Sequence, residues 1–487
     1  MVLLLGRFVA AAHTGRCRMC KIWDIVLGGI LIMAAFTQIV EQASDILWNY
    51  LLLFLLVGTG IFFTIKLHFV QLSSFADGVR HLFKGFSLHG KAADKDGMSS
   101  FQALATAIAA QVGTGNITGC ATALVSGGPG ALFWTWVSAF FGMATIYAEA
   151  VLAQTYRTTV DGQVTGGPAY YIRAAFKGKF GKFLATFFSV ALILALGFMG
   201  NMVQSNSIGD AFHNAFGLNR LAVGVVVAAI AAFIFLGGVQ RIAAVTEKVV
   251  PIMAAFYILG CIAILVINAK ALPGALAQVF VLASEPQAMA GGIAGVTVQQ
   301  SMRFGVARGL FSNEAGSGSA PCAAAAAECD DPVKMGLVQA LGVLIDTVVI
   351  CSCTAFLMLL VPQEITAGLN GMDLLQTAMQ YHLGSFGIVF IAVILALFSF
   401  STFLGVLYYA RGNVAYLCGD NWWSQTAYKL LALAMLLVGG TQAYTVVWDL
   451  GDVGIGLMTI FNMLALIPLS GEALTALNDY EKRKKIK

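Results

Sequence analysis

Residues Gln111 to Gly119 read QVGTGNITG and lie in the middle of an otherwise apolar span, Phe101 to Val125. Each glycine in a helix interior costs about 1 kcal/mol relative to alanine, so the three glycines of this stretch disfavour a continuous helix. In lipid, an unwound backbone persists only where it is buried in protein or lines a wet cavity. The stretch therefore predicts a membrane helix that is broken at a buried functional site.

A second stretch of the same kind, Ser312 to Pro321, reads SNEAGSGSAP and interrupts the apolar span that begins near Gly291. Paired interruptions at corresponding places in two halves of a chain are the best sequence indication of a transporter's binding site. The alternative is that these glycines only permit close packing of helices, as small residues do in membranes. We favour the first interpretation and predict the binding site at the two breaks.

The composition is typical of a membrane protein with many spans. Hydrophobic residues make up 59% of the chain and charged residues 11%, whereas soluble domains carry roughly 25% charged residues. The nine cysteines lie mostly in apolar spans, where a thiol packs as a small hydrophobic group, so we predict no disulfide framework. All six histidines fall in loops or at span ends, which excludes a Ser-His pair at membrane depth. We expect neither an enzyme nor an organic cofactor nor a nucleic-acid partner.

The apolar spans predict a leading helix followed by two sets of five helices, and the unbroken ones are close to the roughly 20 residues that cross a bilayer. The predicted helices are 47–66, 101–125 (broken), 130–153, 183–207, 219–237, 247–268, 291–326 (broken), 335–361, 384–410, 427–444 and 447–469. They form a single transporter domain, 46–472, with the leading helix 47–66, repeat one over 101–268 and repeat two over 291–469.

The N-terminal extension, 1–45, has two interpretations. Ile22 to Val40 is apolar enough to span a bilayer marginally, and it follows four basic residues. It is either an additional helix, or translation starts at Met33 and the residues before it are not translated. The charge pattern of the loops favours the start at Met33, because those basic residues would otherwise face the outside.

Lysine and arginine are distributed unequally between the two sides of the predicted helices. Most of the 28 lie in the segments 66–100 and 154–182 and in the basic tail 473–487, whereas the outer loops after residue 101 hold only Arg220 and Lys270. Because basic residues in short loops mark the cytoplasmic side, we predict a cytoplasmic C-terminus in the plasma membrane, which is the inner membrane of a bacterium. Five helices in each half then give halves of opposite topology, which is an inverted repeat.

Several blocks of the sequence resemble one family of transporters. They include GTGNITG in the first break, GGPGALFW at Gly127 to Trp134, GVARGLFSNEAGSGSAP at Gly305 to Pro321 and FSFSTFLG at Phe398 to Gly405. In this order they resemble the bacterial and archaeal sodium:alanine (alanine or glycine:cation) symporter family. The resemblance implies an all-α integral membrane protein with a leucine-transporter-type fold. That fold is a 5+5 inverted repeat with one extra leading helix, in which the first and sixth core helices are broken.

The chain departs from the family pattern in the eighth core helix. Val406 stands where the pattern often has Trp, and Arg411-Gly412 replaces Gly-Glu. Loss of a Trp near the site would enlarge the pocket. Although the resemblance implies sodium-driven uptake of a small neutral amino acid, this departure puts alanine itself in doubt as the preferred substrate.

A zwitterionic amino acid needs hydrogen-bond donors for its carboxylate and acceptors for its ammonium group. The first break exposes backbone N–H groups at the start of a half-helix, which suit a carboxylate, and the freed carbonyls of the two breaks suit Na+ or the ammonium. Gln204 shares a helix face with Asn201 and is predicted to contact the substrate; the alternative is an interhelical hydrogen bond. The predicted substrate-binding residues are Gly113, Thr114, Gly115, Asn116, Gln204, Asn313, Gly316, Ser317, Gly318 and Thr402.

Sodium is a hard cation, and such ions bind oxygen ligands. Asn116 offers a side-chain oxygen, and the helix 384–410 offers hydroxyl groups, although serine and threonine in helices often bond only to their own backbone. The family resemblance implies that Ser401 and Thr402 complete a sodium site with the first break. The predicted Na+ ligands are Gly113, Asn116, Ser399, Ser401 and Thr402.

Ionisable groups at membrane depth are costly and often functional. Glu314 is the candidate for coupling, either by balancing Na+ or by receiving a proton; alternatively it pairs with Arg303 or Arg308 or caps freed N–H groups in the break. Asp346 is predicted either to make interhelical hydrogen bonds or to bind a cation.

Three further carboxylates lie closer to the ends of the predicted helices. We expect Glu149 to be solvated or paired with Arg157. Asp449 and Asp452 flank the start of an outer helix, and we expect them to be either solvated or helix-start charges.

The resulting hypothesis is a secondary active transporter that couples Na+ to the symport of a small neutral amino acid by alternating access. Alanine or glycine is the expected substrate, and Na+ is the co-transported ion. The alternative is a proton-coupled symporter or an exchanger of the same fold, and a channel is a third class. We expect a monomer in the lipid bilayer.

Overall fold

The computed structural model describes residues 35–84, 100–236, 238–284, 297–440 and 444–486 of the chain. Within these ranges the regular elements are helices, apart from one short antiparallel hairpin formed by β1 (Thr158–Val160) and β2 (Gln163–Thr165). Residues 1–34 lie outside the described ranges, so the two interpretations of the N-terminal extension stay predictions.

The elements up to the middle of the chain are η1 (Leu47–Leu52), α3 (Leu53–Lys66), α4 (Val70–Ser73), α5 (Phe75–Lys84), α6 (Ser100–Gln111), η2 (Gly115–Gly119), α7 (Cys120–Gly127), α8 (Gly130–Thr155), α9 (Pro168–Ala175), α10 (Gly178–Leu192), η3 (Ile193–Gly200), α11 (Asn201–Phe216), α12 (Arg220–Leu236) and α13 (Gly238–Ile267). The elements that follow are α14 (Leu272–Ser284), α15 (Val298–Asn313), α16 (Pro321–Ala326), α17 (Pro332–Val343), η5 (Leu344–Cys351), α18 (Ser352–Leu359), α19 (Gln363–Thr366), α20 (Gly371–Leu383), α21 (Ser385–Cys418), α22 (Trp422–Gly439) and α23 (Tyr444–Ile486). Labels beginning with η mark π-helical segments.

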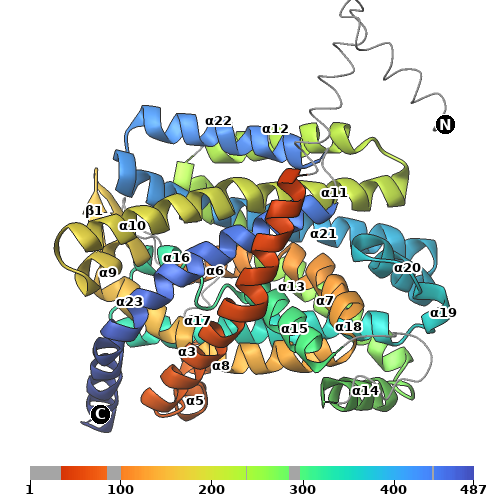
Figure 1. Cartoon of the computed structure of the whole chain (residues 1–487), viewed down its shortest axis with the longest axis horizontal. Helices are drawn as coiled ribbons and strands as arrows, with labels where there is room; N and C mark the ends of the chain where they lie inside the picture. The colour runs from red at the N-terminus through yellow and green to blue at the C-terminus, as the bar shows by residue number, and fades with distance from the viewer. Residues whose placement is uncertain (1–34, 85–99, 237, 285–296, 441–443, 487) are drawn as a thin grey trace, which may run out of the picture.

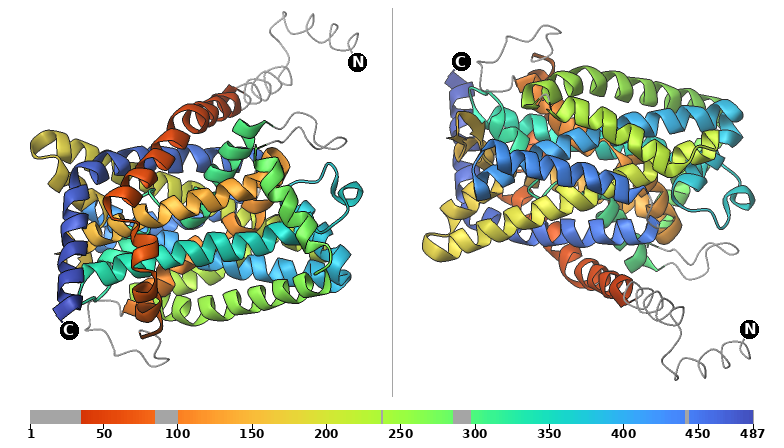
Figure 2. Two further views of the ribbon diagram at one scale, coloured as in Figure 1. Left: turned by 90° about the horizontal axis from the view of Figure 1, so that it is seen from below. Right: turned by 90° about the horizontal axis from the view of Figure 1, so that it is seen from above.

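Seven of the described helices are long and apolar enough to cross a membrane, which makes the chain a multi-pass membrane protein. They are Ala35–Lys66, Gly130–Thr155, Gly178–Phe216, Ala244–Ile267, Pro332–Leu359, Ser385–Cys418 and Val447–Lys484. Two shorter apolar helices, Arg220–Phe235 and Leu272–Ser284, accompany them. Most of the long helices lie alongside one another, parallel to the long axis of the molecule (Figure 1), and Figure 2 shows the same bundle from two other sides.

The observed helices overlap the predicted spans and extend beyond several of them, whereas residues 291–296 and 441–443 of two predicted spans lie outside the described ranges. The segment predicted as 183–207 is helical from Gly178 to Phe216. The predicted leading helix, 47–66, belongs to a helix that begins at Ala35. The predicted basic tail is not a separate element, because α23 continues as a helix through Ile486. Hydropathy finds only the apolar part of a helix, so ends that project into polar surroundings are missed.

The first predicted break is present, but it is short. After α6 ends at Gln111, only two residues leave the helical path before the π-helical segment η2 begins, and α7 continues from it. A π-helix shifts the hydrogen-bond pattern by one residue and occurs mostly as single turns at functional sites. The glycines of this stretch are therefore accommodated largely inside a distorted helix rather than in an extended loop.

The second break is longer and leaves seven residues, 314–320, without helical structure between α15 and α16. Gly316 and Gly318 adopt positive φ values of 92° and 84°, a region that glycine enters without steric cost. Glu314 also has a positive φ, 58°, which is uncommon for a residue with a Cβ. Pro321 occupies the first turn of α16, where its missing N–H costs nothing, and thereby restarts the helix.

The two breaks lie next to each other in the interior. A Cβ placed on Gly115 would lie 3.0 Å from the Cα of Ser312, so glycine is needed for this approach. The Gln111 side chain also donates a 3.1 Å hydrogen bond to the backbone carbonyl of Asn313. The long helix α8 packs against both α15 and α17 and supports this centre.

Candidate functional site

The end of α6 meets the middle of α21 at a cluster of oxygen atoms. The Thr402 hydroxyl donates to the carbonyl oxygens of Ala109 at 3.0 Å and Val112 at 3.2 Å. The neighbouring Ser401 hydroxyl donates to the carbonyl of Phe398 at 2.8 Å. All of these side chains are buried. The Thr402 hydroxyl therefore meets two backbone carbonyls at the end of α6 in a buried place, whereas the Ser401 hydroxyl bonds to its own helix and lies 3.4 Å from the Met253 sulfur.

Small residues allow the two helices to approach closely here. A side chain on Gly113 would overlap the Thr402 hydroxyl, and a Cβ on Gly405 would lie 2.9 Å from the Cα of Ala110. Small residues at helix contacts permit such close backbone approach in membranes. Gly113 is therefore required for packing as well as for the break.

Asp346, which lies in the π-helical segment η5, connects the two breaks. Its carboxylate accepts hydrogen bonds from the Asn116 amide at 2.6 Å, from the Ser312 hydroxyl at 2.7 Å and from the Thr347 hydroxyl at 2.8 Å. Asn116 belongs to the first break and Ser312 immediately precedes the second. No ion pair to Asp346 is present in the described part of the chain. Of the two expectations for Asp346, the interhelical hydrogen bonds are thus observed.

Asn116 and Asn313, both predicted to bind ligands, are held by protein groups. The Asn116 side-chain oxygen accepts from the Gly113 backbone N–H at 2.8 Å, which closes the turn at the first break. Asn313 donates to Thr347 at 3.0 Å and accepts from the backbone N–H of Ala315 at 3.0 Å. In this conformation both amides shape the breaks, and their role as ligand contacts stays a prediction.

Glu149 holds the second break. Its carboxylate accepts the backbone N–H of Gly316 at 2.9 Å and that of Gly318 at 3.0 Å. The Asn462 amide, from α23, donates to the same carboxylate and to the Gly316 carbonyl. Glu149 is fully buried, so the expectation that it is solvated or paired with Arg157 is wrong. Arg157 instead donates to the side chain of Gln154 and to the backbone carbonyl of Ala327, the residue that follows α16.

Glu314 lies at the start of the second break and is buried. Its carboxylate accepts a 2.7 Å hydrogen bond from the Ser319 hydroxyl. It does not pair with either arginine that the sequence suggested, because Arg303 pairs with Asp45 and Arg308 pairs with Asp452. Glu149, and not Glu314, caps the freed N–H groups of the break.

A buried ion pair and two aromatic rings cover the breaks on the side opposite the C-terminus. Arg308 and Asp452 form a two-pronged ion pair with distances of 2.9 and 2.6 Å, and their side chains are only 7% and 6% exposed. The expectation that Asp452 is solvated is therefore wrong. The Trp448 ring lies 4.9 Å below the Arg308 guanidinium and 4.8 Å from the Phe311 ring. A Cβ on Gly119 would lie 3.3 Å from the Trp448 ring, so this ring lies directly against the first break.

Some buried polar atoms near the breaks have no hydrogen-bond partner among the described residues. They belong to Gln111, Thr114, Gln204 and Ser399. Because buried polar groups are nearly always satisfied by protein, water or ligand, such atoms mark places where a ligand or water binds. Gln204 lies on α11 next to Val203, which packs with Trp448 beside the breaks. Thr114, Gln204 and Ser399 were predicted from the sequence, whereas the free oxygen of Gln111 was not.

The structure thus brings Gly113 and Thr402 together directly, and it links Asn116 to the second break through Asp346. The Ser401 hydroxyl instead bonds to Phe398 and Met253. Gly316, Ser317 and Gly318 lie in the second break, but two of their N–H groups are occupied by Glu149. The sequence predicted freed carbonyls at the breaks but not that they are those of Ala109 and Val112, and the role of Glu149 was missed. Backbone carbonyls leave no trace in residue types, whereas a carboxylate inside an apolar helix is a signal that could have found Glu149.

Comparison with known proteins identifies the family. Residues 33–487 match the sodium:alanine symporter family. The probable sodium/glutamine symporter GlnT of Bacillus subtilis is 42% identical over 448 residues, which are 92% of this chain and 91% of that protein. The sodium/alanine symporter AgcS of Methanococcus maripaludis is 38% identical over 457 residues, 92% of this chain and 98% of that protein.

Among solved structures, a manganese transporter of Eremococcus coleocola superposes with a TM-score of 0.50 at 14% sequence identity. The match covers 76% of this chain and 78% of that one, and it supports a shared transporter fold. The chain is accordingly a transporter rather than an enzyme, and it belongs to the sodium:alanine symporter family.

Proposed function

We propose that the chain couples the inward movement of Na+ to the symport of a small neutral amino acid, with alanine or glycine as the first candidates, by alternating access. The observation that carries the proposal is the contact between α6 and α21, where the Thr402 hydroxyl meets the Ala109 and Val112 carbonyls beside the first break. The family supports sodium coupling and amino acids as substrates, and the buried oxygen cluster supplies a place for the ion.

The sodium site of this proposal consists of the Ala109 and Val112 carbonyls and the Ser401 and Thr402 hydroxyls. All four groups are neutral oxygen ligands, which suit a hard monovalent cation. The Thr402 hydroxyl already lies within 3.2 Å of both carbonyls, so a cation could engage the same three oxygens with small movements. Ser399, whose hydroxyl has no partner among the described residues, remains a further candidate, whereas Asn116 would first have to leave Asp346.

The substrate in this proposal lies against the first break. Thr114 and Gln204 carry buried polar atoms without partners in the described part of the chain, and Thr402 connects the substrate to the ion. The backbone around Gly113 and Gly115 would bind the carboxylate. Since Glu149 occupies the N–H groups of the second break, that break would contribute carbonyl oxygens to the ammonium group instead.

The architecture and orientation belong to the same proposal. The positions of the two breaks support two inverted repeats of five helices after the leading helix, and the basic segments support a cytoplasmic C-terminus in the plasma membrane. The buried Arg308 and Asp452 pair then closes the outer side, which fits one state of an alternating-access cycle. We propose that the monomer is the working unit.

Glutamine is a second candidate substrate, and one residue favours it. Val406 is buried one helical turn after Thr402, so both side chains share a face of α21. A valine where the family pattern often has Trp leaves room for a side chain longer than that of alanine. The relative with 42% identity is named as a probable sodium/glutamine symporter, which agrees with this reading.

Proton coupling through Glu314 is the alternative mechanism. Glu314 is a buried carboxylate in the second break and has no ion pair in the described part of the chain. It would titrate during transport if protons replaced Na+.

One experiment tests these alternatives together. Labelled alanine, glycine, serine and glutamine are offered to proteoliposomes with an inward Na+ gradient at fixed pH, and separately with a pH gradient without Na+. We expect accumulation of one or more of these amino acids only with Na+, and we expect Thr402→Val to raise the Na+ concentration for half-maximal uptake by about tenfold. Accumulation driven by pH alone would transfer the coupling role to Glu314, and a lack of any accumulation would refute symport.

A further inference from the structure

A pocket opens at the end of the molecule that carries the C-terminus and lies outside the site described so far. Its empty volume is about 370 Å³. The hairpin, the first turn of α16, the last turns of α21 and the loop after it contribute the walls, through residues that include Val160, Gln163, Thr165, Cys322, Arg411 and Asp420. Figure 1 shows the hairpin and the C-terminus at the same end of the helix bundle.

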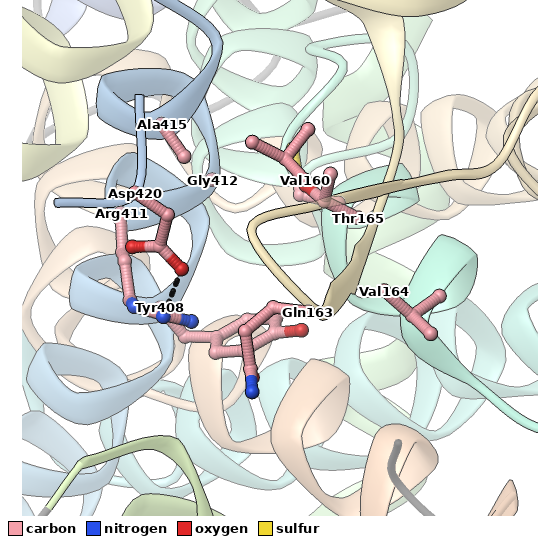
Figure 3. A pocket seen from close by; sticks show the side chains of 10 residues that line it. Val160, Gln163, Val164, Thr165, Tyr408, Arg411, Gly412, Ala415 and Asp420 are labelled. Atoms are coloured by element: carbon pink, nitrogen blue, oxygen red, sulfur yellow. Dashed lines mark hydrogen bonds and ion pairs between the residues drawn. The ribbon is translucent and has the colours of Figure 1, made fainter. Parts of the chain in front are cut away.

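The pocket carries a cation and an anion on one wall. Arg411 and Asp420 form an ion pair with a distance of 2.5 Å, and their side chains are 20% and 6% exposed. Figure 3 shows this pair on one side of the opening and Val160 and Thr165 of the hairpin on the other, with Gln163 between them. The second carboxylate oxygen of Asp420 is buried and has no hydrogen-bond partner among the described residues. Asp420 therefore retains an acceptor that its arginine partner does not use.

The inner end of the pocket adjoins the second break. Cys322 lines the pocket and follows Pro321, the first residue of α16. Its thiol donates to the Gly318 carbonyl, and the Asn413 amide of α21 donates to its sulfur at 3.6 Å. A molecule in the pocket would thus be separated from the break by one turn of α16.

We propose that this pocket is a second binding site for the transported amino acid, in which Arg411 binds the substrate carboxylate and Asp420 binds its ammonium group. The proposal rests on the proposed function and orientation, which make the pocket cytoplasmic. A zwitterion carries one positive and one negative charge, as the ion pair does. It can therefore insert between Arg411 and Asp420, so that the single contact between them is replaced by a carboxylate–Arg411 contact and an ammonium–Asp420 contact. The planar guanidinium suits two parallel hydrogen bonds to a carboxylate.

The pocket is open to solvent, so its empty volume of about 370 Å³ includes space beyond the wall residues. The charged pair would act in the release of substrate to the cytoplasm or in its capture from there.

The alternative is that Arg411 and Asp420 only brace the end of α21. The Asp420 backbone N–H donates to the Asp161 carboxylate at 2.9 Å, so the loop after α21 is joined to the hairpin in either case. A brace would affect both faces of the transporter equally, because it acts on the stability of the fold. A release site would affect the affinity for substrate on one face only.

The test uses membrane vesicles of both orientations and the full-length protein. Right-side-out vesicles give the KM of Na+-driven uptake at the outer face, and inside-out vesicles with Na+ outside give the KM at the cytoplasmic face. We expect Arg411→Gln and Asp420→Asn each to raise the cytoplasmic KM by about tenfold, the effect of losing one charge-assisted hydrogen bond, with the outer KM unchanged. Arg411→Lys keeps the charge and serves as the second variant; it should raise the cytoplasmic KM less.

Lys334→Gln is the matched control. Lys334 pairs with Asp330 outside the pocket, and its hydrogen bond holds the pKa of Asp330 below its ordinary value, so this variant also removes one ion pair. It should change neither KM. Equal losses at both faces, or no change in the cytoplasmic KM of the Arg411 variants, would overturn the second site. Absence of Na+-driven uptake by the wild-type protein in right-side-out vesicles would instead refute the proposed function.

Discussion

The two breaks interrupt their helices in opposite ways. The first is short, continues as the π-helical segment η2, and is closed by the Asn116 side chain on the Gly113 backbone N–H. The second leaves seven residues unwound, contains two glycines with positive φ, and is held by the Glu149 carboxylate from another helix. The first break is thus shaped largely by its own residues, whereas the second depends on a group supplied from outside it.

This difference indicates that the two breaks have different roles. Glu149, Asn462 and Tyr171 form a chain of hydrogen bonds that ties the second break to α8, α23 and α9. The first break keeps a buried hydroxyl, that of Thr114, without a partner in the described part of the chain, and it touches α21 through Thr402. We infer that the first break presents groups to ligands and that the second acts mainly as a braced joint between α15 and α16.

The largest effect is expected from removing the brace. Glu149→Leu leaves the N–H groups of Gly316 and Gly318 buried without acceptors, and each such group costs about 1 to 3 kcal/mol. We expect loss of transport together with a lower melting temperature of the purified protein in detergent.

Glu149→Gln is the isosteric companion, because its one amide oxygen can still accept one of the two N–H groups. It should retain more stability than the leucine variant. Full transport by Glu149→Leu would show that the second break does not need an acceptor from α8.

An intermediate effect is expected at the first break. Asn116→Leu removes the acceptor for the Gly113 N–H and one donor to Asp346, so uptake should be abolished while the protein remains in the membrane at a normal level. Thr122→Val is the control, since Thr122 lies on the adjoining helix α7 and its hydroxyl donates back to the Thr118 carbonyl at 3.0 Å. Near-normal uptake by Asn116→Leu, measured beside this control, would contradict the placement of the site.

The smallest effect on the protein itself is expected at Val406. Val406→Trp adds a large ring one turn from Thr402, which should narrow the choice of substrate towards the smallest amino acids without loss of sodium dependence. Competition of labelled alanine uptake by unlabelled glycine, serine and glutamine measures this choice. An unchanged competition profile would mean that Val406 does not border the substrate.

Much of the fold could be predicted because hydropathy reports burial in lipid directly. The spans from 130 to 153 and from 384 to 410 fall inside α8 and α21, and both breaks occur where glycine makes a helix unfavourable. The polar ends were less predictable. Helices α14, α19 and α20 lie in segments that were not predicted as helical. Helix α14 is apolar but has only 13 residues, too few to cross a membrane, and α19 and α20 are short and more polar.

The sequence predicted which residue types form the site, but not how those residues are arranged. Gly113 and Thr402 were named from the sequence and lie in contact, but their geometry depends on the close approach of α6 and α21. The partners of the carboxylates were not predictable from spacing. Arg157 lies two turns from Glu149 in sequence, yet Glu149 bonds to residues far along the chain, and Asp452 was expected in water but lies buried on Arg308.

The sequence by itself determined three properties: that this protein spans a membrane, at which residues its helices break, and to which family it is similar. These properties follow from residue types and their local order. Only the tertiary structure decided which oxygen atoms converge and which charges are paired. Backbone carbonyls such as those of Ala109 and Val112 exist at every residue, so their selection depends on which helix packs beside them. The same holds for Arg411 and Asp420, because they line a pocket only where the hairpin and α16 supply its other walls.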